Sequence, residues 1–223
     1  MSLNAPTPIV LIAENIACRR GGRRVFSNLN LQLGVGQALW LRGPNGSGKT
    51  SLLRILAGLA RPDSGSLRWV AGPGPAGSAA PAGRPGFIGH SNALNDGLSA
   101  GEALSFLCSL RGRAPERSRQ IEALARFGLA HRIDMPVRRL SQGQRRKTAL
   151  ARLWLDEAAI WLLDEPYDAL DREGCAVLDE ALGAHLQRGG SLVMTSHQAV
   201  TLAGVQDFDL ALIPQCASRR AVQ

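Results

Sequence analysis

The chain has 223 residues, 45% of them hydrophobic, which is enough apolar surface for one compact domain with a core of its own. Its longest apolar stretches, such as Ala158 to Leu163, are far shorter than the ~20 residues that a membrane-spanning helix needs, and its N-terminus lacks the pattern of a secretory signal. These features argue against a membrane-spanning chain and predict a globular protein in the cytosol.

The charge balance and the cysteines limit the kinds of partner and of cysteine site that we expect. The net charge of +8 favours anionic partners, but a single Tyr and five Phe offer few surfaces on which nucleic-acid bases could stack. We therefore expect no nucleic-acid partner, and attraction to nucleotide or anionic lipid headgroups instead. The four cysteines are scattered, with no Cys-x-x-Cys pair and no matching His spacing, which indicates neither a zinc site nor a disulfide framework. They are Cys18, Cys108, Cys175 and Cys216.

The first third of the chain changes pattern near Gly43. Before it, Ile9–Ile16, Leu29–Leu33 and Ala38–Leu41 alternate as strands do, and we expect them to pair antiparallel. From Gly43 onward the pattern becomes strand, glycine-rich loop and helix, with the helix predicted over Lys49–Leu59. A parallel α/β core is expected to begin there.

A loop and a group of helices are predicted next. Residues 71–86 are almost entirely Gly, Ala, Pro and Ser, a composition typical of a flexible surface loop. Ser99 and Glu102 match a capping box that opens a helix through Leu110. Two more helices are predicted at Pro115–Phe127 and Gln142–Asp156.

The last part of the chain returns to strands. Ala159–Leu163 and Ser191–Thr195 are short apolar runs without alternation, as expected of strands buried on both faces of a parallel sheet. A last apolar segment lies at Phe208–Ile213. The order of elements predicts an α/β fold in which helices are inserted between strands of one sheet.

A phosphate-binding loop is the clearest chemical motif. The pattern G-x-x-x-x-G-K-[ST] follows a predicted strand and opens a helix, which is the context that the motif requires. Its glycines allow backbone N–H groups to turn toward phosphate oxygens, Lys49 adds a positive charge, and the Thr50 hydroxyl can ligate Mg²⁺. The predicted nucleotide contacts are Gly43, Pro44, Asn45, Gly46, Ser47, Gly48, Lys49, Thr50 and Ser51.

Two carboxylates follow the predicted strand that ends at Leu163. In open α/β folds ligands bind at the carboxyl edge of the sheet, where Asp164 and Glu165 are expected to project. We expect Asp164 to hold Mg²⁺ through water, and Glu165 to accept a proton from the attacking water or to orient it.

A second helix N-terminus lies between these motifs. In the run Leu140-Ser-Gln-Gly-Gln144, Ser141 and Gly143 stand just before a predicted helix, where backbone N–H groups favour an anion. Such a sequence alone is usually only a helix cap.

Taken together, the motifs resemble those of the ABC ATPases. In that family the segment matching Ser141, Gly143 and Gln144 is the signature motif, which reaches across a dimer to the γ-phosphate held by the partner's phosphate loop. Residues 167–171, ending at Asp171, resemble the family's D-loop, and His197 resembles its switch histidine, which contacts the γ-phosphate. The resemblance implies ATP and Mg²⁺ as cofactors and makes Lys49, Glu165 and His197 the expected catalytic residues.

The resemblance also implies a fold and its division. It predicts a P-loop NTPase core of the ABC ATPase type, with an N-terminal antiparallel β subdomain and an inserted helical subdomain. The core, including the antiparallel part, is expected at residues 8–90 and 158–213. The helical subdomain with the signature motif is expected at residues 91–157.

Two positions depart from the general family. The aromatic residue that usually stacks on adenine is absent, and Arg20 occupies that stretch, so the Arg20 guanidinium plane or Phe26 is expected to do the stacking. His90 stands where the family has the glutamine of its Q-loop. We expect a neutral His90 that moves in when the loop closes; the alternative is that His90 only packs against the loop.

Further features resemble one branch of the family, the ATP-binding subunits of bacterial haem exporters that serve cytochrome c maturation. They are Gly89-His90, the run Ala149–Leu155, the run Trp161–Pro166 and the short chain. The resemblance implies a homodimer, peripheral at the cytoplasmic face of the inner membrane and docked on integral membrane transporter subunits, expected to be cytochrome c maturation proteins B and C. It extends from about Glu14 to Val200.

Two alternatives stay open from sequence. A subunit serving another cargo would share every motif, since ATPase subunits touch the membrane partners rather than the cargo. A soluble ABC ATPase acting on ribosomes or DNA is disfavoured, because such translation factors carry two ATP cassettes and the DNA-repair kind inserts a long coiled coil before the signature motif.

Overall fold

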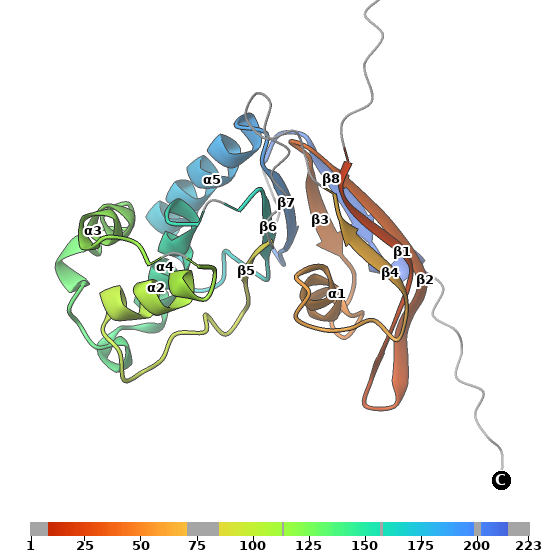
Figure 1. The fold of residues 1–223 in the computed structure, drawn as a ribbon, viewed down its shortest axis with the longest axis horizontal. Helices are drawn as coiled ribbons and strands as arrows, with labels where there is room; N and C mark the ends of the chain where they lie inside the picture. The colour runs from red at the N-terminus through yellow and green to blue at the C-terminus, as the bar shows by residue number, and fades with distance from the viewer. Residues whose placement is uncertain (1–8, 71–84, 113, 157, 199–201, 214–223) are drawn as a thin grey trace, which may run out of the picture.

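In the computed structural model, described for residues 9–70, 85–112, 114–156, 158–198 and 202–213, the chain forms two sheets. The first is antiparallel, in the order β2-β1-β4 (Figure 1). Its strands are β1 Ile9–Arg20, β2 Arg23–Gly34 and β4 Ser64–Trp69. The β1-β2 hairpin turns at Gly21 and Gly22, whose φ values of 54° and 76° suit glycine.

The second sheet has five strands in the order β5-β6-β7-β3-β8, and every neighbouring pair is parallel. Its strands are β3 Ala38–Arg42, β5 Gly86–Ile88, β6 Ile160–Leu163, β7 Ser191–Thr195 and β8 Val205–Asp209. Every residue of β6 and β7 is buried, which confirms the two strands expected from unalternating apolar runs.

The antiparallel pairing expected for Ala38–Leu41 was wrong. These residues form most of β3, which lies between β7 and β8 in the parallel sheet. A five-residue strand is too short for alternation to decide its partners, and Ala38, Leu39 and Leu41 are all buried. The strands β4 and β5 were missed, because β4 is rich in Ser and Gly and β5 has only three residues.

The five α-helices of the described chain are α1 Lys49–Leu56, α2 Ala100–Ser109, α3 Arg117–Ala125, α4 Gln142–Ala151 and α5 Arg172–Gln187. The capping box at Ser99 and Glu102 is confirmed. Three helices, α1, α3 and α4, are shorter than expected. After α1 the chain turns through Gly58 at φ 70°, and α4 continues only as the short 3-10 helix η4, Arg152–Trp154.

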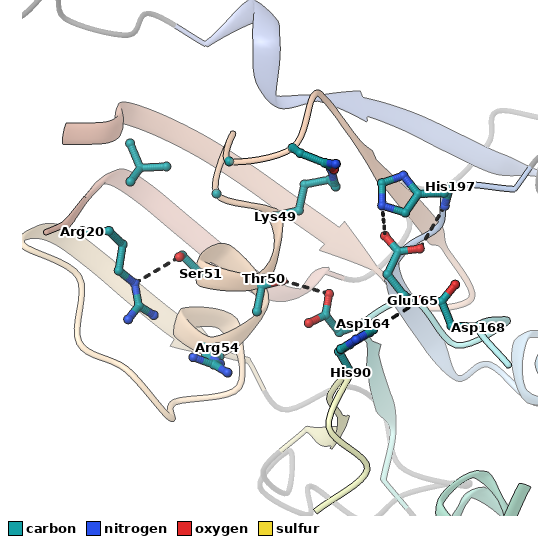
Figure 2. A pocket seen from close by; sticks show the side chains of 14 residues that line it. Arg20, Lys49, Thr50, Ser51, Arg54, His90, Asp164, Glu165, Asp168 and His197 are labelled. Atoms are coloured by element: carbon teal, nitrogen blue, oxygen red, sulfur yellow. Dashed lines mark hydrogen bonds and ion pairs between the residues drawn. The ribbon is translucent and has the colours of Figure 1, made fainter. Parts of the chain in front are cut away.

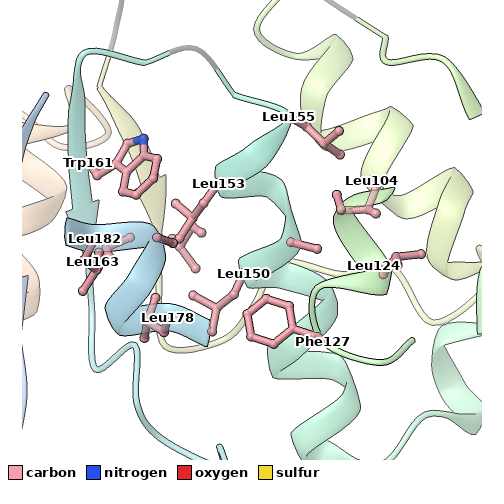
Figure 3. Packing of buried hydrophobic residues seen from close by; sticks show 14 of the residues in the cluster. Leu104, Leu124, Phe127, Leu150, Leu153, Leu155, Trp161, Leu163, Leu178 and Leu182 are labelled. Carbon is pink, nitrogen blue, oxygen red and sulfur yellow. The ribbon is translucent and has the colours of Figure 1, made fainter. Parts of the chain in front are cut away.

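Helices cover both faces of the parallel sheet. On one face α1 lies between the two sheets, packed on β1, β6 and β7 (Figure 1). On the other face α5 packs on β7, and α2, α3 and α4 form a group beyond it. Figure 3 shows Leu150 of α4 beside Leu178 of α5 and Phe127. These contacts join the helical group to α5, which itself packs on β7 of the sheet.

The predicted surface loop and the expected absence of a membrane-spanning helix remain to be compared with the structure. The loop expected at residues 71–86 lies outside the described residues, apart from 85 and 86. Over the described ranges, we find no helix of the length and apolar character that crossing a membrane requires.

A buried aromatic pair anchors α5 to the sheet. The His185 ring stacks on Trp161 of β6, with ring centroids 3.7 Å apart and planes 6° from parallel. Its Nε2 lies 3.2 Å from the Ser191 carbonyl, so Nε2 carries the proton and donates it. Gly190 is required here, because a side chain at that position would meet the imidazole ring. Burial lowers the pKa of His185 to about 4, although the hydrogen bond to Ser191 opposes the shift.

This pair makes stability depend on pH in a definite window. An unfolded histidine has a pKa of about 6.5, so between about pH 6.5 and 4 the unfolded chain takes up the proton first. We expect the free energy of unfolding to fall by about 3 kcal/mol across that window because of His185. His185→Phe keeps a stacked ring without a titrating group, and should flatten the pH dependence measured by urea unfolding. The exposed His131→Gln is the control; parallel curves for wild type and His185→Phe would contradict the assignment.

Candidate functional site

A pocket of about 510 Å³ lies at the carboxyl ends of β3, β6 and β7 (Figure 2). Because these strands run parallel, the segments that follow them meet at one edge of the sheet. The loop after β3 leads into α1, Asp164 and Glu165 follow β6, and His197 follows β7. Of the described residues, those lining the pocket are Arg20, Val25, Asn45, Gly46, Gly48, Lys49, Thr50, Ser51, Arg54, His90, Asp164, Glu165, Asp168 and His197.

The phosphate loop has the backbone of an anion cradle. Gly43, Gly46 and Gly48 have φ values of 135°, 84° and 99°, which only glycine adopts without strain. A side chain at Gly48 would collide with Val25, so the backbone must approach closely there. The Ser47 hydroxyl is buried, and no described group within hydrogen-bonding distance satisfies it. A glycine-rich loop of this kind at a helix N-terminus, with an unpartnered hydroxyl, fits the phosphates of a nucleotide.

The Lys49 side chain is hydrogen-bonded to the phosphate loop. Its Nζ donates hydrogen bonds to the Gly43 carbonyl at 2.7 Å and to the Pro44 carbonyl at 3.3 Å. Gly43 and Lys49 also border a second hollow of about 550 Å³, which reaches His197 from the β8 side. The ammonium group therefore lies within the curve of the loop, beside the space where phosphate oxygens would lie.

Asp164 is the centre of a buried network of hydroxyl groups. It is only 2% exposed, and its Oδ1 accepts hydrogen bonds from Thr50 Oγ1 and Thr195 Oγ1, both at 3.1 Å. Thr195 Oγ1 in turn accepts the backbone N–H of Glu165 at 2.8 Å. A threonine hydroxyl and a carboxylate are the kinds of oxygen ligand that Mg²⁺ takes, so the donor set fits that ion.

Glu165 is oriented by the segment after β7. Its Oε2 accepts the backbone N–H of His197 at 2.9 Å, and its Oε1 lies 3.6 Å from His197 Nε2 (Figure 2). The residue is 9% exposed and has a φ of 49°, the left-handed region that a residue with a side chain seldom adopts. The carboxylate is thus held between the wall of the pocket and His197.

His90 enters the pocket from the loop after β5. Its Nδ1 lies 3.5 Å from Asp168 Oδ2, and the His90 side chain is 70% exposed. Figure 2 shows His90 close to Asp164 and Asp168, on the side of the pocket away from Lys49. His90, which stands where the family has the Q-loop glutamine, is therefore open to a ligand and lies next to the carboxylates.

The opposite end of the pocket is basic. Arg20 Nε donates to Ser51 Oγ at 3.2 Å, and Arg54 lies one helical turn further along α1; both stand far from Glu165 and His197 in Figure 2. Phe26, the alternative platform for adenine, is only 1% exposed and packs in the core, so that alternative was wrong. Val25, its neighbour, lines the pocket instead.

The predicted signature residues do not line this pocket. Ser141 caps α4 by accepting the Gln144 N–H at 3.2 Å, while Gln144 Oε1 accepts the Ser141 N–H at 3.0 Å. Gly143 follows within the first turn of α4. Asp171 is also apart from the pocket: it caps α5 at Gly174 and pairs with Lys147 at 2.7 Å. The Lys147 hydrogen bond, with that from Gly174, lowers the pKa of Asp171.

Sequence reasoning missed several contributors to the site. Thr195 belongs to a recognised strand, but nothing in a strand pattern shows that its hydroxyl joins Asp164 to Glu165. Arg54 could have been found, because it lies four residues after Thr50 on the same face of a helix. Asp168 was recognised only as part of a loop motif, and its position beside His90 depends on the tertiary fold.

Comparisons with known proteins show the family of this chain. Residues 26–168, more than half of the chain, match the protein-family model described as ABC transporter. A protein of Pseudomonas savastanoi pv. phaseolicola, named cytochrome c biogenesis ATP-binding export protein CcmA, is 44% identical over 92% of this chain and 97% of its own length. The protein of the same name from Methylococcus capsulatus is 46% identical over 87% of this chain and 94% of its own.

Solved structures match at the level of the fold. The dimeric bacterial ABC transporter cassette MJ0796 superposes with a TM-score of 0.75 at 21% identity, over 90% of this chain and 95% of that one. A dimeric post-hydrolysis state of the same cassette, bound to ADP and phosphate, gives a TM-score of 0.72 at 23% identity, over 84% and 88%. These matches confirm the predicted α/β architecture with its antiparallel and parallel sheets.

Proposed function

Because this chain belongs to the ABC transporter family, as its ATP-binding and ATP-hydrolysing subunit, we propose that its pocket takes ATP with Mg²⁺ between two copies of the chain. We propose further that the complex serves cytochrome c biogenesis as part of a haem exporter. One observation carries the first proposal. The phosphate loop, two carboxylates and a histidine from different strands line one pocket at the carboxyl edge of a parallel sheet.

The phosphate loop is proposed to hold the β- and γ-phosphates. The residues assigned to it are Gly43, Pro44, Asn45, Gly46, Ser47, Gly48, Lys49, Thr50 and Ser51. Backbone N–H groups of the loop would face phosphate oxygens, and the Lys49 ammonium, now on the carbonyls of Gly43 and Pro44, would bridge them. Thr50 is proposed to ligate Mg²⁺ directly and Asp164 through water, since their oxygens already lie 3.1 Å apart. Bound Mg²⁺ would neutralise charge on the transferred phosphoryl group.

Glu165 is proposed as the general base and His197 as its companion. The His197 N–H fixes one Glu165 oxygen at 2.9 Å and leaves the carboxylate turned to the pocket, where it can accept a proton from water. The His197 ring, 3.6 Å from the other oxygen, stands where it could contact a γ-phosphate oxygen. Both groups sit at the end of the pocket opposite Arg20.

The second copy would supply the residues that are missing from the pocket. Ser141, Gly143 and Gln144 open α4 away from the pocket of their own chain, and Asp171 caps α5 rather than facing nucleotide. In a two-chain sandwich the N-terminus of α4 would face the γ-phosphate held by the partner's loop. Each pocket would then be complete only in the dimer.

Glu165→Gln tests the base and the sandwich together. The amide keeps the hydrogen bond from His197 but cannot accept a proton, so ATP binding should persist while turnover falls by about 100-fold or more. ATP and Mg²⁺ should then trap a dimer, seen by sedimentation velocity. The double variant with Lys49→Ala is the control and should stay monomeric. If Glu165→Gln remains monomeric with ATP at every concentration, two copies of this chain do not suffice for the sandwich.

Arg20 is proposed to receive the nucleobase on its guanidinium plane. The hydrogen bond to Ser51 fixes the guanidinium beside α1, and Arg54 adds a second cation at the same end. No Phe, Tyr or Trp is among the described residues that line the pocket. A guanidinium can stack on any nucleobase, since every base has a π face.

His90 is proposed to act on the lytic water or the Mg²⁺ shell as the Q-loop glutamine would. Its exposure and its position next to Asp164 and Asp168 support that role. We expect His90→Ala to lower the ATPase rate by about tenfold with little change in nucleotide affinity, and His90→Gln to restore much of it. An imidazole and an amide each offer a polar atom to water or to the Mg²⁺ shell, and a methyl group offers none.

Steady-state hydrolysis by the assembled complex measures the effect of His90. His131→Ala, at an exposed position in the helical part, is the matched control. Equal rates for wild type, His90→Ala and His90→Gln would leave His90 with a packing role only.

The helical insert is proposed as a separate subdomain. We assign residues 91–157 to it and residues 8–90 and 158–213 to the nucleotide-binding core. The placement of α2, α3 and α4 together, apart from both sheets, supports this division (Figure 1).

Identity over almost the whole length of relatives named for cytochrome c biogenesis and export supports the transport proposal. We place the chain as a peripheral subunit at the cytoplasmic face of the bacterial inner membrane, bound to integral membrane subunits of the cytochrome c maturation B and C kinds. Co-purification of the tagged full chain from detergent-solubilised membranes tests this. Capture of those two proteins is the expected result. Capture of permease subunits of another kind would contradict the haem proposal and indicate a different transported substrate.

A further inference from the structure

Arg146 is a buried charged side chain whose donors are all bonded, and no step proposed above uses it. It lies in α4, two residues after Gln144, and is 2% exposed. A guanidinium has five N–H donors in a rigid planar fork. Arg146 makes five hydrogen bonds, one for each donor.

Three of the five bonds hold the segment that follows β6. Arg146 Nη2 donates to the carbonyls of Asp164 at 3.0 Å and Glu165 at 2.6 Å, and Nε donates to the carbonyl of Pro166 at 3.3 Å. Three consecutive carbonyls thus converge on one cation. Without a cation they would repel one another in a buried place, so the guanidinium stabilises the turn.

That turn contains the left-handed Glu165, whose φ of 49° is strained for a residue with a side chain unless its surroundings fix it. The bond to the Glu165 carbonyl from Arg146 and the bond from the Glu165 N–H to Thr195 hold both sides of the residue. The direction of the carboxylate toward His197 follows from this backbone. Arg146 therefore orients Glu165 without touching its carboxylate.

The remaining two bonds hold the loop that bears His90. Nη1 of Arg146 donates to the Gly89 carbonyl at 2.9 Å and to Asn92 Oδ1 at 2.8 Å. One side chain of the helix that begins after Ser141 thus ties together the Glu165 turn and the His90 loop. Burial lowers the pKa of Arg146, and the carboxylates of Asp168, Asp164 and Glu165 oppose that shift.

We propose that Arg146 is a positioning residue that sets Glu165 and the His90 loop in a fixed relation to the N-terminus of α4. A displacement of α4, as when Ser141 meets a nucleotide on another copy, is then transmitted to the proposed base through a rigid fork. The inference rests on the proposed function, because it gives Glu165 the role of base. It adds that hydrolysis depends on a group that contacts neither nucleotide nor water.

Arg146→Lys tests the proposal, since lysine keeps the charge but cannot make five bonds in a plane. Arg152→Lys is the matched control: Arg152 is 9% exposed and donates to the Phe87 carbonyl, outside the pocket. In steady-state ATPase assays of the full complex we expect kcat to fall by about 30-fold in Arg146→Lys, with KM for ATP changed by less than about threefold. Arg152→Lys should keep kcat within about twofold while lowering the melting temperature comparably.

A second measurement separates positioning from general damage. In the Glu165→Gln background, Arg146→Lys should lower the residual rate by less than about twofold, because it acts through Glu165. Should Arg146→Lys fail to fold, Asn92→Gly removes one of the five acceptors at a φ of 54° that glycine tolerates, and should lower kcat by about threefold.

Several results would overturn the inference. They are an unchanged kcat in Arg146→Lys, or in Asn92→Gly where it is the variant used; an equal loss in Arg152→Lys; and a full additional loss in the Glu165→Gln background. Failure of the proposed function gives a different result: Glu165→Gln itself would then retain the wild-type rate.

Discussion

Parallel pairing of β3, β6 and β7 brings together residues that are far apart in the sequence. Each strand ends at the same edge, so the loop before α1, the carboxylates after β6 and the histidine after β7 occupy one pocket. The pairing is stable because Leu41, Leu162 and Val193 face α1 and Leu163, Leu192 and Met194 face the helices on the other side. The strands of this sheet therefore bury apolar side chains on both faces.

Short hydrogen-bonded links across this edge convert the strand positions into a site. Asp164 accepts hydrogen bonds from a hydroxyl group of α1 and a hydroxyl group of β7. One carboxylate therefore couples the phosphate loop to its neighbouring strands. Glu165 is linked to β7 by Thr195 and to the next loop by His197. A buried polar network is costly when one member is unsatisfied, and each link here fixes a specific side-chain direction.

The sequence predicted the motifs and the buried strands well, because both are local. A glycine-rich loop before a helix, a capping box at Ser99 and an unalternating run at β7 each carry their reason within a few residues. The pairing of β3 and the burial of Phe26 could not be predicted, since they depend on what lies across the sheet. The role of Arg146 was hidden for the same reason: its five acceptors come from two distant segments.

The charges of the pocket also favour one direction for the proposed nucleotide. Arg20 and Arg54 stand at one end, and Asp164, Glu165 and Asp168 at the other, with Lys49 on the loop between them. In the proposed complex the polyphosphate follows the loop, which would direct the γ-phosphate toward the carboxylates and the base toward the arginines. In the proposed complex, three carboxylates beside a γ-phosphate would repel it, and a divalent cation bound together with the nucleotide would offset that repulsion. The same repulsion disfavours the reversed orientation and keeps the proposed base next to the phosphorus atom that water attacks.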